Sequence, residues 1–158
     1  MRILHTADWH LGKLFYGNYL TEDQAYVLEQ QLLPMIRDEG IDAVVLAGDV
    51  YDRSLPPAEA VELFDDVATR ITADLHVPFL VISGNHDSAD RIAFGTQLLA
   101  GSRVYVSPVF AAPPAPITLT DEYGPVDVWL LPFLKPAAVR HVFPDEKIES
   151  YNDAIGCV

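Results

Sequence analysis

Three short polar clusters in the chain carry residue types that bind divalent metal ions. They are Asp8-Trp9-His10, Gly48-Asp49 and Gly84-Asn85-His86-Asp87. Carboxylate, imidazole and amide groups without a thiol suit harder ions such as Mn²⁺ or Mg²⁺, with Fe²⁺ and Zn²⁺ as alternatives. Each cluster follows a short apolar run. If these runs are neighbouring parallel strands, the three clusters meet at one edge of the sheet.

The spacing within these clusters predicts a two-metal phosphoesterase site. Asp8 and His10 are two residues apart, and in an extended segment both side chains would point the same way and hold one cation. Asp49 could bridge that cation to a second one, for which Asn85 is the candidate ligand. Two ions about 4 Å apart clamp the attacking and departing oxygens of a phosphate ester. His86 suits an acid that protonates the leaving oxygen.

Asp52, Arg53 and Asp87 flank the clusters, and the sequence leaves two roles open for each of them. Asp52 and Arg53 either support the metal ligands or are ordinary loop charges. Asp87 either orients His86 or caps the helix that follows it. An isolated Asp-x-His or Gly-Asp pair is most often a turn or a cap. The prediction of a metal site therefore depends on the three clusters occurring together.

A loop directly after His10 mixes one cation with aromatic side chains, which are Lys13, Phe15, Tyr16 and Tyr19. Such a set can stack on single-stranded DNA and steer it. Packing of this loop against the core is the other interpretation, and it is the commoner situation in proteins.

The apolar runs around the clusters predict an α/β fold with a parallel sheet. Three runs have the pattern of buried strands: Arg2–His5, Asp42–Ala47 and Pro78–Ser83. Helices are expected over Glu22–Glu39, Ala58–Ile71 and Ala89–Ala100. This alternation is typical of βαβ units. Gly48 and Gly84 would let the backbone turn sharply where a strand gives way to its cluster.

The last third of the chain has a different sequence pattern, in which prolines separate short segments typical of strands. Strands are expected over Val104–Ser107, Ile117–Thr120 and Val126–Leu131, with the last two antiparallel. A further helix is expected to start at Tyr151.

Composition limits the class of protein. A length of 158 residues, half of them hydrophobic, suits one ordinary domain with its own core. The net charge of −13 argues against a free-standing nucleic-acid-binding module, although bound cations can invert the local charge of an enzyme site. The single cysteine, Cys157, excludes an internal disulfide and a thiolate zinc site. Without a signal-peptide pattern or a membrane-length apolar run, a cytoplasmic protein with no membrane contact is expected.

Three segments resemble the first three signature segments of the calcineurin-like metallophosphoesterases: MRILHTADWHLGK, AGDVYDR followed by PP, and SGNHDS. Their flanks, and LLPFLKP near Leu130, are similar to the bacterial SbcD nuclease subunits. The similarity runs through nearly all of the chain. It implies a sandwich of two β-sheets flanked by helices. It also implies Mn²⁺-dependent double-strand exonuclease and single-strand endonuclease action in DNA repair and recombination.

The resemblance also implies roles for individual residues. Asp8, His10 and Asp49 would hold the first Mn²⁺ ion, with Asp49 bridging. Asn85 would hold the second ion, and His86 would contact the scissile phosphate. Mg²⁺ is the alternative to Mn²⁺. The implied partners are DNA, an SbcC-type ATPase and a second copy of the chain, paired through helices 58–71 and 89–100. The amphipathic spacing of the first of these helices equally fits plain burial.

The family's remaining metal ligands are histidines of later segments, including a Gly-His-x-His pattern, and this sequence contains none of them. We therefore expect residues 1–158 to be an incomplete N-terminal portion of a metallophosphoesterase (nuclease) domain, weakly active or inactive alone. Two other functions stay open. One is a phosphodiesterase or phosphatase that acts on small molecules or proteins, and the other is a non-catalytic dimerisation or scaffold fragment.

Overall fold

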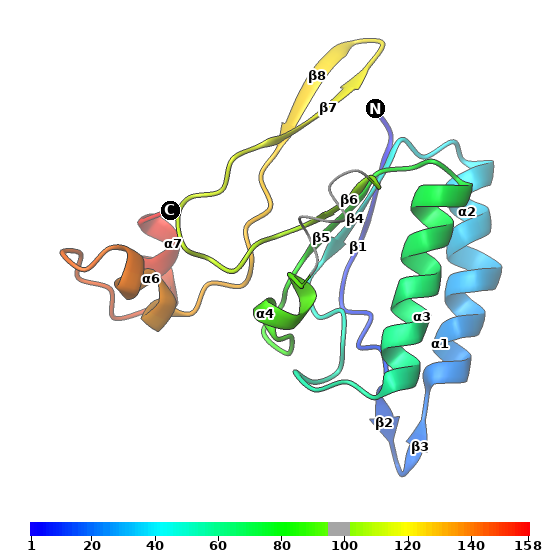
Figure 1. The fold of residues 1–158 in the computed structure, drawn as a ribbon, viewed down its shortest axis with the longest axis horizontal. Coiled ribbons are helices and arrows are strands. Elements are labelled where there is room, and N and C mark those ends of the chain that lie inside the picture. Colours follow the sequence, from blue (N-terminus) through cyan, green and yellow to red (C-terminus); the bar gives the residue numbers. More distant parts are fainter. Residues whose placement is uncertain (95–101) are drawn as a thin grey trace.

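A parallel sheet organises the molecule in the computed structural model, which describes residues 1–94 and 102–158 (Figure 1). Its four strands lie in the order β1-β4-β5-β6 and are all parallel to their neighbours. Their bounds are Ile3–Thr6 for β1, Ala43–Ala47 for β4, Phe79–Ile82 for β5 and Val104–Val106 for β6. The α/β fold with a parallel sheet is therefore confirmed. Because β1, β4 and β5 run in one direction, the three polar clusters meet at their carboxyl ends.

Two long helical stretches lie side by side on one face of the sheet (Figure 1). The first consists of α1 (Thr21–Val27), the π-helical turn η1 (Leu28–Leu32) and α2 (Leu33–Asp38). Pro34 has no N–H to donate, and the wider π turn ends two residues before it, at Leu32. The second stretch consists of α3 (Ala58–Thr69) and η2 (Arg70–Asp74), so this helix ends three residues beyond the predicted Ile71.

The main core fills the space between these helices and the sheet. Phe79 of β5 is fully buried there, together with Ile36, Val67 and Ile71 from the helices. The indole of Trp9 stacks on the Phe79 ring, with 6.0 Å between ring centroids. Burial of one large apolar side chain contributes about 1.5–3 kcal/mol. The backbone on either side of Trp9, which includes two residues of the first polar cluster, is thereby fixed to the core.

The opposite face of the sheet packs against an antiparallel hairpin of β7 (Ile117–Asp121) and β8 (Gly124–Val128). Leu119 and Leu130 from this region contact Ala43 and Leu80 of the sheet. The pairing of β7 with β8 is the predicted antiparallel one. Residues 129–131 lie beyond the end of β8, although they were expected to continue the strand. Because the turn at Asp121–Gly124 is tight, β8 starts at Gly124, two residues before the predicted Val126.

Two short helices complete the fold, α6 (Pro136–Val142) and α7 (Tyr151–Gly156). They pack on each other around a small core of their own, formed by Leu134, Val139, Ile148 and Ala154. The start of α7 at Tyr151 confirms the prediction. Helix α6 was not predicted, although Pro136 stands in its first turn, where proline suits a helix.

The helix predicted over Ala89–Ala100 is confirmed at its start and is wrong at Ala93 and Phe94. Helix α4 spans only Ala89–Ile92, and Ala93 and Phe94 form a turn, while residues 95–100 of the prediction lie outside the described residues. None of the helices formed by the described residues has the length and apolar composition needed to cross a membrane.

Candidate metal centre

The loops after β1 and β4 stay paired beyond the ends of the strands. The backbone N–H of Asp8 donates to the Gly48 carbonyl at 3.1 Å, and that of His10 donates to the Asp49 carbonyl at 2.9 Å. Leu11 continues the pairing with Val50 at 2.9 Å. The first and second polar clusters are therefore held in a fixed register by the main chain, before any side chain contributes.

Three of the residues in these clusters have a left-handed backbone. The φ angle is 56° at Asp8, 44° at His10 and 46° at Asp49. The expectation that Asp8 and His10 lie on an extended segment is therefore wrong. A non-glycine residue in this region costs about 1–3 kcal/mol and persists only where the surrounding structure holds it, which is typical of functional sites.

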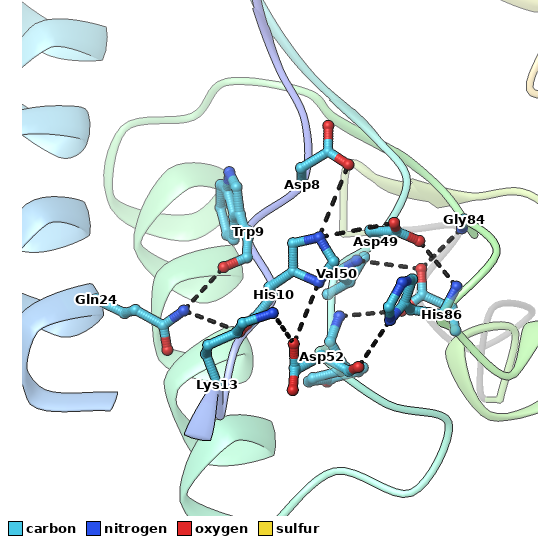
Figure 2. Close-up of polar contacts among 12 residues, drawn as sticks. Asp8, Trp9, His10, Lys13, Gln24, Asp49, Val50, Asp52, Gly84 and His86 are labelled. Atoms are coloured by element: carbon cyan, nitrogen blue, oxygen red, sulfur yellow. Dashed lines mark hydrogen bonds and ion pairs between the residues drawn. The ribbon is translucent and has the colours of Figure 1, made fainter. Parts of the chain in front are cut away.

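The left-handed turns bring the side chains of Asp8, His10 and Asp49 close together (Figure 2). His10 Nε2 lies 3.9 Å from Asp8 Oδ1 and 3.8 Å from Asp49 Oδ2. These separations are too long for hydrogen bonds. They suit ligands that share one cation, because metal–ligand distances of about 2.0–2.2 Å place neighbouring ligands about 3–4 Å apart.

His86 joins the same group from the loop after β5. Ligand atoms of His10, Asp49 and His86 all lie within 4.8 Å of one another. The backbone N–H of His86 donates to Asp49 Oδ1 at 3.0 Å, while the other oxygen of this carboxylate faces His10. Asp49 is buried and His86 is exposed. The residues thus fit a divalent cation, with a histidine on the side that substrate can reach.

Asn85 and Asp49 border the same cavity. Its volume is about 240 Å³, Asp8 also borders it, and Phe133 closes one side. The backbone N–H of Phe133 donates to the Ser83 carbonyl at 2.9 Å, which fixes that wall to the end of β5. Asp49 therefore borders both places where a cation was predicted. The role of Asn85 as a ligand of the second ion stays a prediction.

Two glycines make this arrangement possible, for different reasons. Gly48 has φ +83°, the sharp turn that the sequence predicts. Gly84 is needed for space, because a Cβ atom there would lie 2.1 Å from Asp49 Oδ1 and 2.3 Å from the Asp49 backbone nitrogen. Only glycine at position 84 therefore allows the loops after β4 and β5 to approach closely enough to bring Asp49 to His86.

Asp87 contacts the backbone of the loops after β4 and β5, and its role in orienting His86 stays a prediction. Its buried carboxylate accepts hydrogen bonds from the backbone N–H groups of Val50 at 3.1 Å, Tyr51 at 3.0 Å and Gly84 at 2.8 Å. No side chain caps α4. Asp87 therefore joins the loop after β4 to the loop after β5 and sets the distance between Asp49 and His86 through the main chain.

Tyr51 lies beside this carboxylate in the core. Burial raises the pKa of Tyr51 to about 12, and the negative charges of Asp87 and Asp65 add to the shift. The phenol is therefore neutral at physiological pH and adds no charge next to the candidate ligands.

Gln24 of α1, which no sequence pattern indicated, holds the backbone of the first cluster (Figure 2). Its Nε2 group donates to the carbonyls of Trp9 and His10, both at 2.9 Å, and its Oε1 accepts from the Gly12 N–H at 3.1 Å. One amide thus satisfies three backbone groups of a strained loop. No local signal reveals this role, because a lone glutamine on a helix has no motif around it.

The side chains of Asp52 and Arg53 point in different directions and have different partners. The Asp52 carboxylate turns inward, with Oδ1 2.8 Å from Lys13 Nζ and 3.5 Å from His10 Nδ1. Arg53 turns outward, and its guanidinium donates to the Tyr19 hydroxyl at 3.4 Å. Asp52 therefore lies against a candidate ligand, whereas Arg53 contacts the loop that follows the first cluster.

A comparison with protein families identifies the group to which this centre belongs. The family model for calcineurin-like phosphoesterases matches residues 1–150. The chain belongs to the calcineurin-like phosphoesterase family. Members of this family are hydrolases that bind divalent metal ions, which agrees with the donor set of His10, Asp49 and His86. As a calcineurin-like phosphoesterase, the chain carries its candidate ligands on the loops after β1, β4 and β5.

The Gly84→Ala substitution tests the close approach between the loops after β4 and β5. We expect it to weaken Mn²⁺ binding at least tenfold, because the added methyl group must push the Asp49 carboxylate away from the other ligands. Isothermal titration calorimetry measures the affinity. Gly156→Ala is the matched control, since a Cβ atom there meets nothing within 4 Å. Equal Mn²⁺ affinities for the two variants would contradict this geometry.

Proposed function

We propose that this calcineurin-like phosphoesterase is a Mn²⁺-dependent DNA nuclease subunit of the SbcD type, which hydrolyses phosphodiester bonds during DNA break repair. The observation that carries the hydrolytic part is the convergence of His10, Asp49 and His86 at the carboxyl ends of three parallel strands. The finer assignment to a nuclease is supported by the resemblance of the segments around these residues to SbcD subunits.

The chemistry follows from how the residues of this group are held. A bound divalent ion would supply Lewis-acid activation of the phosphate and of the attacking water. Asp49, buried between the loops, fixes His86 by accepting its backbone N–H at 3.0 Å. His86 is exposed and its imidazole can give a proton to the leaving oxygen. An arrangement with a buried anchor and an exposed acid suits a large substrate that approaches from solvent.

The loop after His10 supports a nucleic acid as that substrate. It forms a small hairpin of β2 (Leu14–Phe15) and β3 (Asn18–Tyr19). Its aromatic rings are exposed, to 56% for Phe15, 90% for Tyr16 and 55% for Tyr19, so packing of this loop against the core is wrong. Rings presented to solvent beside a phosphoesterase site favour base stacking, which is worth about 1–3 kcal/mol per base.

Exposed apolar side chains near α3 support the proposed homodimer. Leu55, which precedes α3, Val61 of α3 and Phe94, which follows α4, are exposed to 65%, 43% and 86% and border one cavity. The pairing is proposed through α3 and the segment from Ala89. The SbcC-type ATPase follows from the resemblance alone and stays a prediction.

The hydrolytic proposal is tested with bis(p-nitrophenyl) phosphate and Mn²⁺. We expect slow hydrolysis by the chain that is lost in EDTA, and a reduction of about 10²–10⁴-fold in His86→Ala because the proton donor is removed. His141→Ala is the control, since His141 is exposed on α6, away from the metal centre. If Mn²⁺-dependent turnover is absent, the chain is a non-catalytic dimerisation or scaffold fragment. If p-nitrophenyl phosphate is the better substrate, the chain is a phosphatase.

The role of the hairpin is tested by binding of a fluorescent single-stranded oligothymidine. Tyr16→Ala is expected to weaken binding about fivefold or more, which is the loss of one stacked base. Fluorescence anisotropy at one fixed salt concentration gives the affinity. Tyr123→Ala removes an equally exposed tyrosine, 86% accessible, from the β7–β8 turn and should leave the affinity unchanged. An equal loss in both variants would contradict a specific contact at the hairpin.

A further inference from the structure

An exposed aromatic side chain lies at the rim of the cavity beside the metal centre. Phe133 borders this cavity together with Asp49 and Asn85, and it is 38% exposed. Its neighbours in sequence, Pro132 and Leu134, are both buried. Large aromatic residues are mostly buried in folded proteins. This segment therefore buries its smaller side chains and presents its largest apolar one to solvent next to the candidate ligands.

Contacts on both sides fix the position of Phe133. Its backbone N–H donates to the carbonyl of Ser83, directly after β5, at 2.9 Å. The next residue, Leu134, is buried in the small core that joins α6 and α7. The backbone of Phe133 is thus tied to the sheet on one side and to a packed core on the other. The ring is held in place before any ligand arrives, which reduces the cost of binding.

Tyr151, the first residue of α7, places a second ring against Phe133. The two ring centroids are 5.6 Å apart, and the ring planes are inclined by 41°. This distance is typical of favourable aromatic pairs. Tyr151 is itself 54% exposed. The start of α7 is fixed by a capping box, in which the side chains of Ser150 and Asp153 each accept the backbone N–H of the other residue, at 3.2 Å and 2.8 Å.

The cavity itself is too small for a whole nucleotide. Its volume is about 240 Å³, whereas pockets for small molecules measure about 300–1,000 Å³. The carboxylates of Asp8 and Asp49 and the amide of Asn85 border it, and such groups suit a hard cation and the phosphate bound to that cation. The base of a nucleotide bound there therefore lies outside the cavity. Phe133 is the aromatic residue among those that line it.

A cation lies close to the exposed ring. Lys135 and Phe133 are both exposed, and Leu134 between them is buried. The backbone at Lys135 is extended, with φ −80° and ψ 130°, and residues two apart in an extended segment lie on the same side. Exposed rings combined with cations bind single-stranded nucleic acids. In a chain with a net charge of −13, this cation favours a phosphate-bearing ligand over a protein surface.

We propose that Phe133, supported by Tyr151, stacks on the base of the nucleotide whose phosphate occupies the adjacent cavity. The centre then favours phosphoesters that carry a base, and Lys135 contacts the next phosphate of the strand. This base site is separate from the β2–β3 hairpin, which lies far from α7 (Figure 1). The identity of the ligand as a nucleotide rests on the proposed function, whereas stacking on Phe133 is measured by binding alone.

The test compares two ligands by isothermal titration calorimetry in the presence of Mg²⁺. One is deoxyadenosine 5′-monophosphate, and the other is 2-deoxyribose 5-phosphate, which lacks the base. The nucleotide is a product of the proposed diester hydrolysis, so that reaction does not consume it. We expect the wild type to bind the nucleotide about fivefold more tightly or more, which is the effect of one stacked base. Phe133→Ala should bind both ligands equally, and Phe133→Trp should keep the preference.

Further variants separate stacking from other causes. Phe133→Leu keeps an apolar side chain but has no ring face, and it should lose the preference as Phe133→Ala does. Tyr151→Ala should lose part of the preference, whereas Tyr151→Phe keeps the ring and should match the wild type. Tyr123→Ala is the control, because it removes an exposed ring, 86% accessible, from the turn between β7 and β8.

Two outcomes would overturn this proposal. One is a wild type that binds the nucleotide no better than the sugar phosphate, in which case the exposed rings are a contact surface for a protein. The other is a preference for the nucleotide that survives in Phe133→Ala. Failure of the proposed function is distinguishable, because a chain that hydrolyses no phosphodiester would still show whether its preference for a base depends on Phe133.

Discussion

The buried carboxylate of Asp87 is the contact on which the geometry of the metal centre depends. It accepts three backbone N–H groups, two from the loop after β4 and one from the loop after β5. Burial of a charge is costly unless its hydrogen-bonding capacity is satisfied, and each hydrogen bond to a charged group contributes about 1.5–3 kcal/mol. Because all three donors are main chain, Asp87 fixes the backbone of these loops. The positions of Asp49 and His86 follow from it.

Contacts with the main chain also stabilise the strained backbone of the metal centre. Three left-handed residues stand in or beside the ligand loops, which a free chain would not maintain. Gln24 satisfies three backbone groups of the first loop, and Trp9 anchors that loop in the core by stacking on Phe79. The ligands are therefore positioned by the main chain and the core before any ion binds. Such preorganisation reduces the reorganisation required when a cation or a phosphate enters.

The sequence predicted those parts of the structure that depend on local patterns. Short β-branched runs that end in polar clusters indicated the parallel sheet, and the shared direction of its strands placed Asp8, Asp49 and His86 at one edge. The clusters could be grouped without knowledge of their side-chain geometry, because parallel strands align their carboxyl ends.

The parts that could not be predicted depend on contacts between distant segments. The contacts of Asp87 with Val50 and Tyr51, and those of Gln24 with the first loop, join residues 12 to 37 positions apart, and no periodicity in the sequence indicates them. The left-handed backbone at Asp8 and His10 is imposed by pairing with the β4 loop and overrides the extended conformation that the spacing suggested. The exposed β2–β3 hairpin was missed because aromatic residues are more often buried, and only the fold shows which way they face.

Pulsed EPR of Mn²⁺ bound to this chain tests most directly whether the three clusters form one metal centre. Electron spin echo envelope modulation detects ¹⁴N nuclei of imidazoles that coordinate the ion. The structure predicts stoichiometric Mn²⁺ with a nitrogen coupling that persists in His141→Ala and disappears in a His10→Ala/His86→Ala double variant. Bound Mn²⁺ without nitrogen coupling, or a coupling that survives in the double variant, would contradict the central claim.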